Sequence, residues 1–188
     1  MGGNRVIALG GVKHSGKSAV GRAAGRLLRV GFFDTDELLE ELYRERFGAG
    51  RKCREIFSEL GEESFRRLEA DAVSDFLDRA SEFRAVLALG GGTVSNGLVD
   101  WKRGNVLRVM LEVDQDVARE RILASGIPPF LGSTVEEFQR RFPEWFRLRD
   151  AACRRWAGLV FKPDPTLPPA RNAEKLCLAV ADSMKGRK

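Results

Sequence analysis

The sequence is poor in the residues that build disulfide frameworks, zinc sites and membrane spans. It has three cysteines (Cys53, Cys153, Cys177), no CxxC pair and one histidine. An odd number of widely spaced cysteines argues against both a disulfide framework and a zinc site. No apolar run approaches the ~20 residues that cross a bilayer, and the first residues lack the apolar stretch and cleavage site of a secretory signal. We therefore expect a soluble cytoplasmic protein without a membrane partner.

The basic residues lack the pattern of a nucleic-acid-binding surface. The net charge is +5, from 32 Lys and Arg against 27 Asp and Glu. The arginines alternate with acidic residues, the only purely basic run is 185–188, and no aromatic residues are interleaved with it. This charge is typical of a solvated surface with a general attraction for small anions. We expect no nucleic-acid partner and a monomer that binds a small molecule.

Length and apolar patterning favour a single α/β domain over 1–188. A chain of 188 residues suits one domain, and we find no internal repeat or linker. Short apolar runs alternate with segments of helical periodicity, which predicts a parallel sheet covered on both faces. The expected strands are 6–9, 32–33, 85–89, 106–113 and 159–161. The expected helices are 17–28 (with Gly31 just past its end), 37–47, 53–60, 62–79, 114–124, one ending near 156, and 170–184.

One glycine-rich segment predicts a phosphate-binding loop. Residues 11–18, GVKHSGKS, fit G-x-x-x-x-G-K-[ST] and stand between an expected strand and an expected helix. Glycines let backbone N–H groups surround a polyphosphate, and the helix N-terminus adds a positive field. Lys17 would bridge the terminal phosphates, and Ser18 would offer its hydroxyl to Mg²⁺. His14 stands at a variable position of the loop, and we interpret it as a bystander to the chemistry.

Acidic and basic groups follow the loop in positions that fit a second substrate. Asp34 and Asp36 close the second expected strand, where one carboxylate would lie near Mg²⁺ and the other would accept a hydroxyl proton. Alternatively, Thr35 and Asp36 only cap the next helix. Glu69 follows Arg66 by three residues, close enough on a helix to orient a guanidinium that clamps a carboxylate, or to form an ordinary surface ion pair.

Residues 90–92, Gly-Gly-Gly, follow the third expected strand as either a backbone-amide nest or a tight turn. Taken in order along the chain, these motifs resemble those of the shikimate kinase family, which belongs to the P-loop kinases related to nucleoside-monophosphate kinases. The set comprises the loop ending Gly-Lys-Ser, Asp-x-Asp, Phe-Arg-Arg-x-Glu, Gly-Gly-Gly, and Arg149 eight residues before Ala157. The phosphate loop is the most specific of these motifs.

The resemblance implies a three-layer P-loop kinase fold with a five-stranded parallel sheet in the order 2-3-1-4-5. It implies transfer of the γ-phosphoryl group of ATP to the 3-hydroxyl of shikimate, with Mg²⁺. Catalytic roles would fall to Lys17 and Asp36. The nucleotide would bind at Gly11, Ser15, Gly16, Lys17, Ser18, Ala19 and Arg121, and the metal at Ser18 and Asp34. Shikimate would bind at Asp36, Arg66, Gly91, Gly92 and Arg149, with substrate-binding helices over about 35–80.

The expected lid, residues 125–134, departs from the family pattern. The family's Arg-Pro-Leu-Leu is replaced by a stretch without arginine, Gly126 to Leu131, so Arg140 or Arg141 would have to replace that charge. In the motif that begins at Arg149, Ala151-Ala152-Cys153 stands where the family has Pro-Leu-Tyr. Because these departures fall in the lid and acceptor regions, two alternatives stay open. One is a related kinase for gluconate or a nucleotide, and the other is a nucleotide-binding module with weak transfer activity.

Overall fold

Five short apolar segments form one parallel β-sheet in a computed structural model that describes residues 6–80, 82–102 and 105–185. The strands are β1 (Val6–Gly10), β2 (Gly31–Asp34), β3 (Ala85–Ala88), β4 (Val106–Leu111) and β5 (Leu159–Phe161). Their order, β2-β3-β1-β4-β5, confirms the predicted one. Most of the basic run at 185–188 lies outside the described residues.

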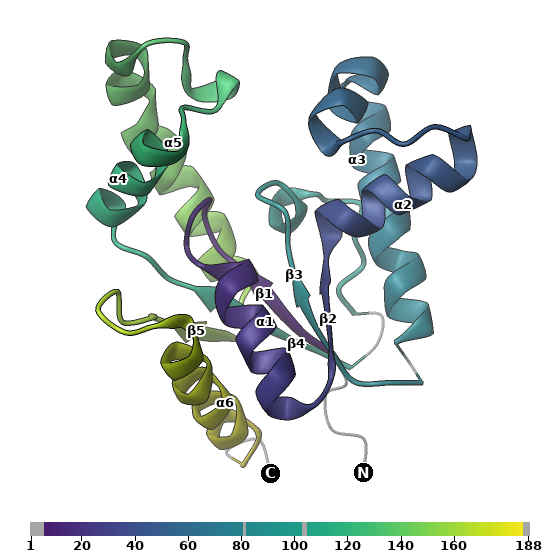
Figure 1. Ribbon diagram of the computed structural model, residues 1–188, viewed down its shortest axis with the longest axis vertical. Coiled ribbons are helices and arrows are strands. Elements are labelled where there is room, and N and C mark those ends of the chain that lie inside the picture. The colour runs from purple at the N-terminus through teal and green to yellow at the C-terminus, as the bar shows by residue number, and fades with distance from the viewer. Residues whose placement is uncertain (1–5, 81, 103–104, 186–188) are drawn as a thin grey trace.

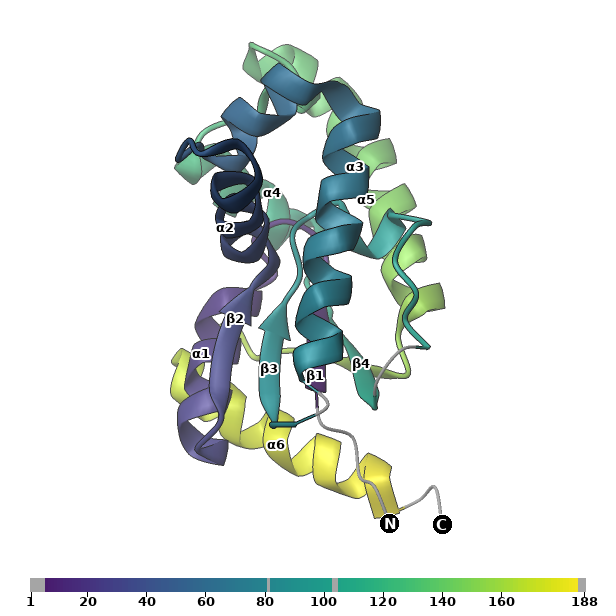
Figure 2. The same cartoon turned by 90° about the vertical axis from the view of Figure 1, so that its right-hand side faces the viewer.

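Helices cover both faces of the sheet (Figures 1 and 2). The helices are α1 (Lys17–Leu28), α2 (Thr35–Phe47), α3 (Cys53–Arg79), α4 (Gln115–Ser125), α5 (Val135–Trp156) and α6 (Pro169–Lys185), with 3₁₀ turns η1 (Thr93–Ser95) and η2 (Pro129–Leu131). One face packs against α1 and α6, where Leu9 and Val86 meet Leu176. The other packs against α3 and the end of α5, where Ala8 and Leu87 join Phe76. The inner strands β1, β3 and β4 are nearly continuous apolar runs because they are largely buried on both sides, whereas the edge strands β2 and β5 are only partly buried.

Two helical arms extend beyond the carboxyl ends of the strands. Figure 1 shows α2 and α3 on one side and α4 with much of α5 on the other, and the loop after β1 lies between them. Ligand sites of open parallel sheets form at this edge, where loops and helix N-termini converge. Within the described residues, no helix is both long enough and apolar enough to cross a membrane.

Several predicted boundaries were wrong for identifiable reasons. Helix α1 ends at Leu28 with Arg29 in the left-handed conformation (φ 54°), and Gly31 belongs to β2. Helix α2 begins at Thr35, and its N-cap is Asp34, whose side chain accepts a hydrogen bond from the Asp36 N–H, so neither Thr35 nor Asp36 is the cap. The expected lid, residues 125–134, contains the 3₁₀ turn η2. The predicted interruption at Gly61 is confirmed: α3 is two helical parts joined by a kink at that residue, where φ is 73° and ψ is 172°.

Candidate active site

The loop between β1 and α1 has the geometry of an anion cradle. Gly11 (φ 142°) and Gly16 (φ 93°) adopt backbone conformations that favour glycine, and a Cβ on Gly11 would lie 2.6 Å from the Leu111 carbonyl oxygen. The Ser15 hydroxyl is buried and has no hydrogen-bond partner among the described residues. An unpartnered buried donor beside a helix N-terminus fits a phosphate oxygen, so the loop suits a triphosphate.

Lys17 folds back over this loop. Its Nζ donates to the carbonyl oxygens of Gly11 at 3.1 Å and Val12 at 3.0 Å. Desolvation lowers the pKa of Lys17 to about 8, and the carboxylates of Asp34 and Asp36 oppose that shift. A phosphate group would further stabilise the charged form of this ammonium, and the role of Lys17 as a phosphate ligand stays a prediction.

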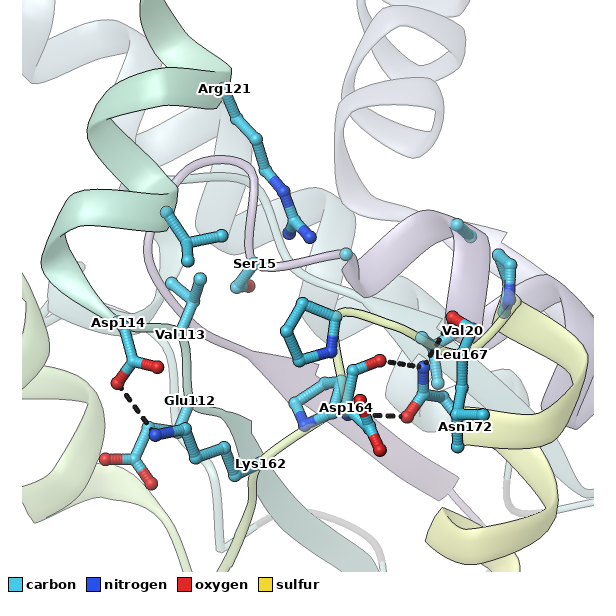
Figure 3. A pocket seen from close by; sticks show the side chains of 16 residues that line it. Ser15, Val20, Glu112, Val113, Asp114, Arg121, Lys162, Asp164, Leu167 and Asn172 are labelled. Atoms are coloured by element: carbon cyan, nitrogen blue, oxygen red, sulfur yellow. Dashed lines mark hydrogen bonds and ion pairs between the residues drawn. The ribbon is translucent and has the colours of Figure 1, made fainter.

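A pocket of about 260 Å³ adjoins the loop (Figure 3). Four residues predicted for nucleotide binding line it: Ser15, Gly16, Ala19 and Arg121. Figure 3 shows Arg121 reaching from α4 toward the loop that carries Ser15. The opposite wall is formed by Lys162, Asp164 and the prolines of the loop before α6, none of which was predicted as a site residue from the sequence. The Pro-Asp-Pro sequence at 163–165 was the feature from which a binding loop could have been predicted.

Ser18 and Asp34 meet where a metal ion was predicted. The Ser18 Oγ donates to the Asp34 Oδ2 at 3.0 Å, while Asp34 Oδ1 accepts from the backbone N–H of Asp36 at 3.1 Å. Asp34 therefore caps α2 with one oxygen and faces the phosphate loop with the other. A hydroxyl beside a carboxylate oxygen is a hard-oxygen donor set that fits Mg²⁺.

Asp36 lies at the turn that follows β3. The buried Thr35 hydroxyl accepts from the backbone N–H of Gly90 at 2.7 Å, which ties the start of α2 to this turn. A Cβ on Gly90 would overlap the Asp36 carboxylate, so only glycine permits the approach. Desolvation in the cleft raises the pKa of Asp36 to about 6, and Asp34 and Glu69 add to the rise. An accessible carboxylate with such a pKa is suited to accept a proton near neutral pH.

A buried carboxylate holds Arg66 in place. Arg66 Nη1 donates to Glu69 Oε2 at 2.9 Å, and Glu69 is only 3% exposed. Glu69 also accepts from the hydroxyl of Thr93 at 2.7 Å and the amide of Asn96 at 2.9 Å. The predicted ion pair is thus part of a buried network and not a surface pair. Sequence reasoning missed Thr93 and Asn96, although polar residues directly after Gly-Gly-Gly were a usable signal.

The Gly90–Gly92 segment brings both predicted carboxylate-binding arginines together. The guanidinium of Arg66 occupies the place where a Cβ on Gly92 would stand. Arg149, from α5, donates to the Gly91 carbonyl oxygen at 3.3 Å and the Ser95 hydroxyl at 3.2 Å. Desolvation lowers the pKa of Arg149, and the nearby Arg66 lowers it further. Residues 91 and 92 form a turn in which the Gly90 N–H donates to Thr35 and the Gly91 carbonyl accepts from Arg149, and substrate binding at Gly91 and Gly92 stays a prediction.

The predicted lid leaves α4 at Gly126 and returns into α5. Its Leu131 is 1% exposed and joins the apolar cluster of α4 and α5, whereas Phe130 is 59% exposed and lies 5.8 Å from the Trp145 ring. Arg140 and Arg141 lie on the solvent side of α5, where both lower the pKa of Glu137 after the larger effect of the Ser133 N–H. Neither is bonded to the phosphate loop in the contacts described, so the predicted replacement for a lid arginine stays a prediction.

Comparison with known proteins identifies the relatives of this chain. Residues 13–162 match the sequence model of the shikimate kinase family. The shikimate kinase of Mycobacterium marinum is 32% identical over 180 residues, covering 87% of this chain and 93% of that one. That of Corynebacterium efficiens is 39% identical over 89 residues, so this match spans only 47% of each chain.

Solved structures agree with the sequence comparison. The shikimate kinase of Acinetobacter baumannii in complex with shikimate is 26% identical, with a TM-score of 0.73, covering 95% of this chain and 94% of that one. A gluconokinase of Sinorhizobium meliloti is 15% identical, with a TM-score of 0.51 over 98% and 94%. The second likeness shows the shared fold alone.

Proposed function

The chain belongs to the shikimate kinase family, and we propose that it transfers the γ-phosphoryl group of ATP to the 3-hydroxyl of shikimate. The observation that carries the acceptor assignment is the meeting of Asp36, Arg66 and Arg149 at the turn 90–92, beside the phosphate loop. The relative from A. baumannii, whose structure contains shikimate, supports the same acceptor.

The two arginines suit the carboxylate of the acceptor. Arg66 is fixed by Glu69 at 2.9 Å, and Arg149 is fixed by two contacts on the turn, so their guanidinium groups are oriented before a ligand arrives. Among the described residues no carboxylate bonds Arg149, which leaves positive charge in the cleft. A bound carboxylate would relieve the repulsion between the two guanidinium groups, and bidentate pairing would set the orientation of the ring.

Asp36 would then receive the proton of the reacting hydroxyl. The hydroxyl oxygen forms a bond to the γ-phosphorus, the bond from that phosphorus to the β–γ bridging oxygen breaks, and ADP leaves. The proton passes to the Asp36 carboxylate, whose pKa of about 6 keeps it mostly ionised at pH 7. Lys17 would hold the terminal phosphates throughout, because phosphoryl transfer depends chiefly on positioning and charge.

ATP and Mg²⁺ are part of this proposal. The pocket lined by Arg121 and the loop before α6 would take the nucleoside, and Ser18 with Asp34 would hold the metal. When bound, Mg²⁺ neutralises developing charge on the phosphates. We propose that the enzyme is cytoplasmic and works as a monomer, since every residue assigned to the cleft comes from this one chain and catalysis would need no second subunit.

A direct assay tests the acceptor. We expect ADP release with shikimate and Mg-ATP to exceed release with gluconate or nucleoside monophosphates by at least about 100-fold in kcat/KM, with shikimate 3-phosphate detected by ³¹P NMR. The Asp36→Asn variant should bind Mg-ADP and turn over at least about 100-fold more slowly. Intact Mg-ADP binding without shikimate turnover would contradict the acceptor and retain the nucleotide site.

A further inference from the structure

His14 has a backbone conformation that residues with a Cβ seldom adopt. Its φ is 64°, and among the described residues only Arg29 is also a non-glycine residue with positive φ. The left-handed region costs such a residue roughly 1 kcal/mol relative to glycine. Glycine serves the positive φ angles of this loop at Gly11 and Gly16. A histidine in such a strained position points to a use for its side chain.

The side chain and the carbonyl of His14 both bond α4. The imidazole Nε2 lies 2.8 Å from the Ser125 hydroxyl oxygen, and the carbonyl oxygen accepts from Arg121 Nη1 at 2.9 Å. Arg121 and Ser125 are four residues apart, so they stand on the same side of the helix. Because the Ser125 hydroxyl donates to the Ile122 carbonyl at 3.3 Å, it is free to accept from the Nε2–H tautomer of His14.

These contacts lie between the two parts of the nucleotide site. Arg121 lines the 260 Å³ pocket together with Ser15 and Gly16 (Figure 3). Ser125 is the last residue of α4, and Gly126, with φ 98°, begins the segment that leads to η2. The phosphate loop also contacts α4 through Val12, which shares an apolar cluster with Ala118 and Ile122. His14 adds the directional polar contact that an apolar cluster cannot supply.

Building on the proposed kinase activity, we propose that His14 is a positioning residue for the nucleotide. Its imidazole fixes the phosphate loop to the end of α4, its carbonyl orients the Arg121 guanidinium at the pocket, and the bond to Ser125 fixes the point from which residues 126–134 extend. This role needs no proton transfer by His14. It differs from the bystander interpretation, which gives the side chain no function.

Calorimetric binding of Mg-ADP, measured without acceptor, tests the role separately from the identity of the acceptor. We expect His14→Ala and Ser125→Ala each to weaken Mg-ADP binding by about three- to tenfold, the range that one neutral hydrogen bond supplies. The double variant should bind Mg-ADP no more weakly than either single variant, because the two side chains form one contact. The KM for ATP should rise in parallel, while the KM for shikimate stays within about twofold.

Three further variants keep the test specific. His14→Gln, whose amide reaches about as far as Nε2, should recover most of the affinity. Glycine adopts the positive φ without strain, so His14→Gly should have a melting temperature no lower than that of the wild type. Because it lacks the imidazole, it should nevertheless bind Mg-ADP as weakly as His14→Ala. Ser183→Ala is the matched control: Ser183 also donates to the carbonyl three residues before it, Val180 at 2.9 Å, but it lies in α6 and should leave Mg-ADP binding unchanged.

Three outcomes would overturn the proposal. One is unchanged Mg-ADP affinity in both single variants. Another is additive losses in the double variant, which would make His14 and Ser125 independent. The third is a fall of kcat by 100-fold or more in His14→Ala with unchanged Mg-ADP affinity, which would make His14 an acid or base in the transfer step.

Discussion

At the scale of single residues, Asp36 is the group to which we assign proton acceptance in the cleft. It is accessible to solvent, but its neighbours Asp34 and Glu69 carry charge of the same sign, and the walls of the cleft remove part of its hydration. Lys17 opposes these effects without cancelling them. The result is a carboxylate with a pKa of about 6, higher than that of an isolated aspartate, and therefore a better proton acceptor.

The pH profile of the reaction should report this group. Asp36 accepts a proton only when ionised, so kcat/KM for shikimate should fall about tenfold per unit as pH decreases below about 6. The measurement is steady-state kinetics from pH 5 to 8 at saturating Mg-ATP. Mg-ADP affinity over the same range separates loss of the base from loss of the nucleotide site. A flat profile down to pH 5 would contradict the assignment of Asp36 as the base.

The same group should reduce stability at neutral pH. With its folded-state pKa raised to about 6, the folded chain binds this proton more tightly than the unfolded chain does, so the free energy of unfolding falls as pH rises from about 4 to 6. Asp36→Asn should remove this loss of stability. Its free energy of unfolding should exceed that of the wild type by about 1 kcal/mol at pH 8, a figure lowered to allow for solvent screening, and by almost nothing at pH 4.

Urea unfolding of wild type and Asp36→Asn at both pH values measures this difference. Asp71→Asn is the control, because its exposed carboxylate pairs with Arg46 at 2.7 Å and its replacement should give no gain at pH 8. A gain for Asp36→Asn that is equal at pH 4 and pH 8 would exclude titration of this carboxyl as the cause.

At the scale of elements, α3 supports the acceptor site as two helices joined at Gly61. The first part packs against α2, where the Tyr43 hydroxyl donates to Glu59 at 2.7 Å and the Cys53 N–H donates to Glu40 at 3.1 Å. The second part carries Arg66 and Glu69 and packs against the sheet. The kink lets one continuous segment serve both neighbours, so the backbone at Gly61 determines where the acceptor arm lies over the cleft.

Gly61→Ala should therefore destabilise the chain through the backbone alone. A Cβ on Gly61 would meet no atom within 4 Å, but φ 73° with ψ 172° is a conformation that essentially only glycine adopts. We expect a loss of about 1–3 kcal/mol in urea unfolding and a higher KM for shikimate. Gly50→Ala is the matched control, since Gly50 is equally open and its φ is not positive. Equal losses in the two variants would argue against strain at the kink.

At the scale of the whole molecule, residue spacing predicted the local features and the family resemblance predicted the strand order, but neither gave the individual contacts that join distant segments. The phosphate loop, with its flanking strand and helix, lies within residues 6–28, and Arg66 with Glu69 are neighbours on one helix, so spacing was sufficient. The contacts of Thr35 with Gly90, Arg149 with Gly91 and His14 with Ser125 join residues 55, 58 and 111 apart. The start of α2 illustrates the limit: Asp34 and Thr35 can both cap a helix, and the bond from Thr35 to a distant turn decides between them.

The proposal places two anion sites in one fold, each dependent on different residues, and ligand-induced stabilisation should separate them. At about 100 times its dissociation constant, a ligand adds about 2.7 kcal/mol, which raises the melting temperature of a chain of this size by roughly 5–10 °C. We expect Lys17→Ala to abolish turnover and the shift with Mg-ADP while keeping the shift with shikimate. Arg66→Ala should lose the shift with shikimate, keep the shift with Mg-ADP, and raise the KM for shikimate far more than that for ATP.

The control for this crossed pattern is Arg67→Ala, one residue along α3. Arg67 pairs with Glu63 at 2.6 Å on the exposed side of the helix, so its loss removes a similar charge without touching the cleft, and both shifts should remain. Loss of both shifts in Arg66→Ala, with a normal melting temperature for the free protein, would mean that the sites are not separately controlled. If Arg66→Ala retains the shift with shikimate, binding of the shikimate carboxylate would be assigned to Arg149 alone, because Arg149 is held by its own contacts to Gly91 and Ser95.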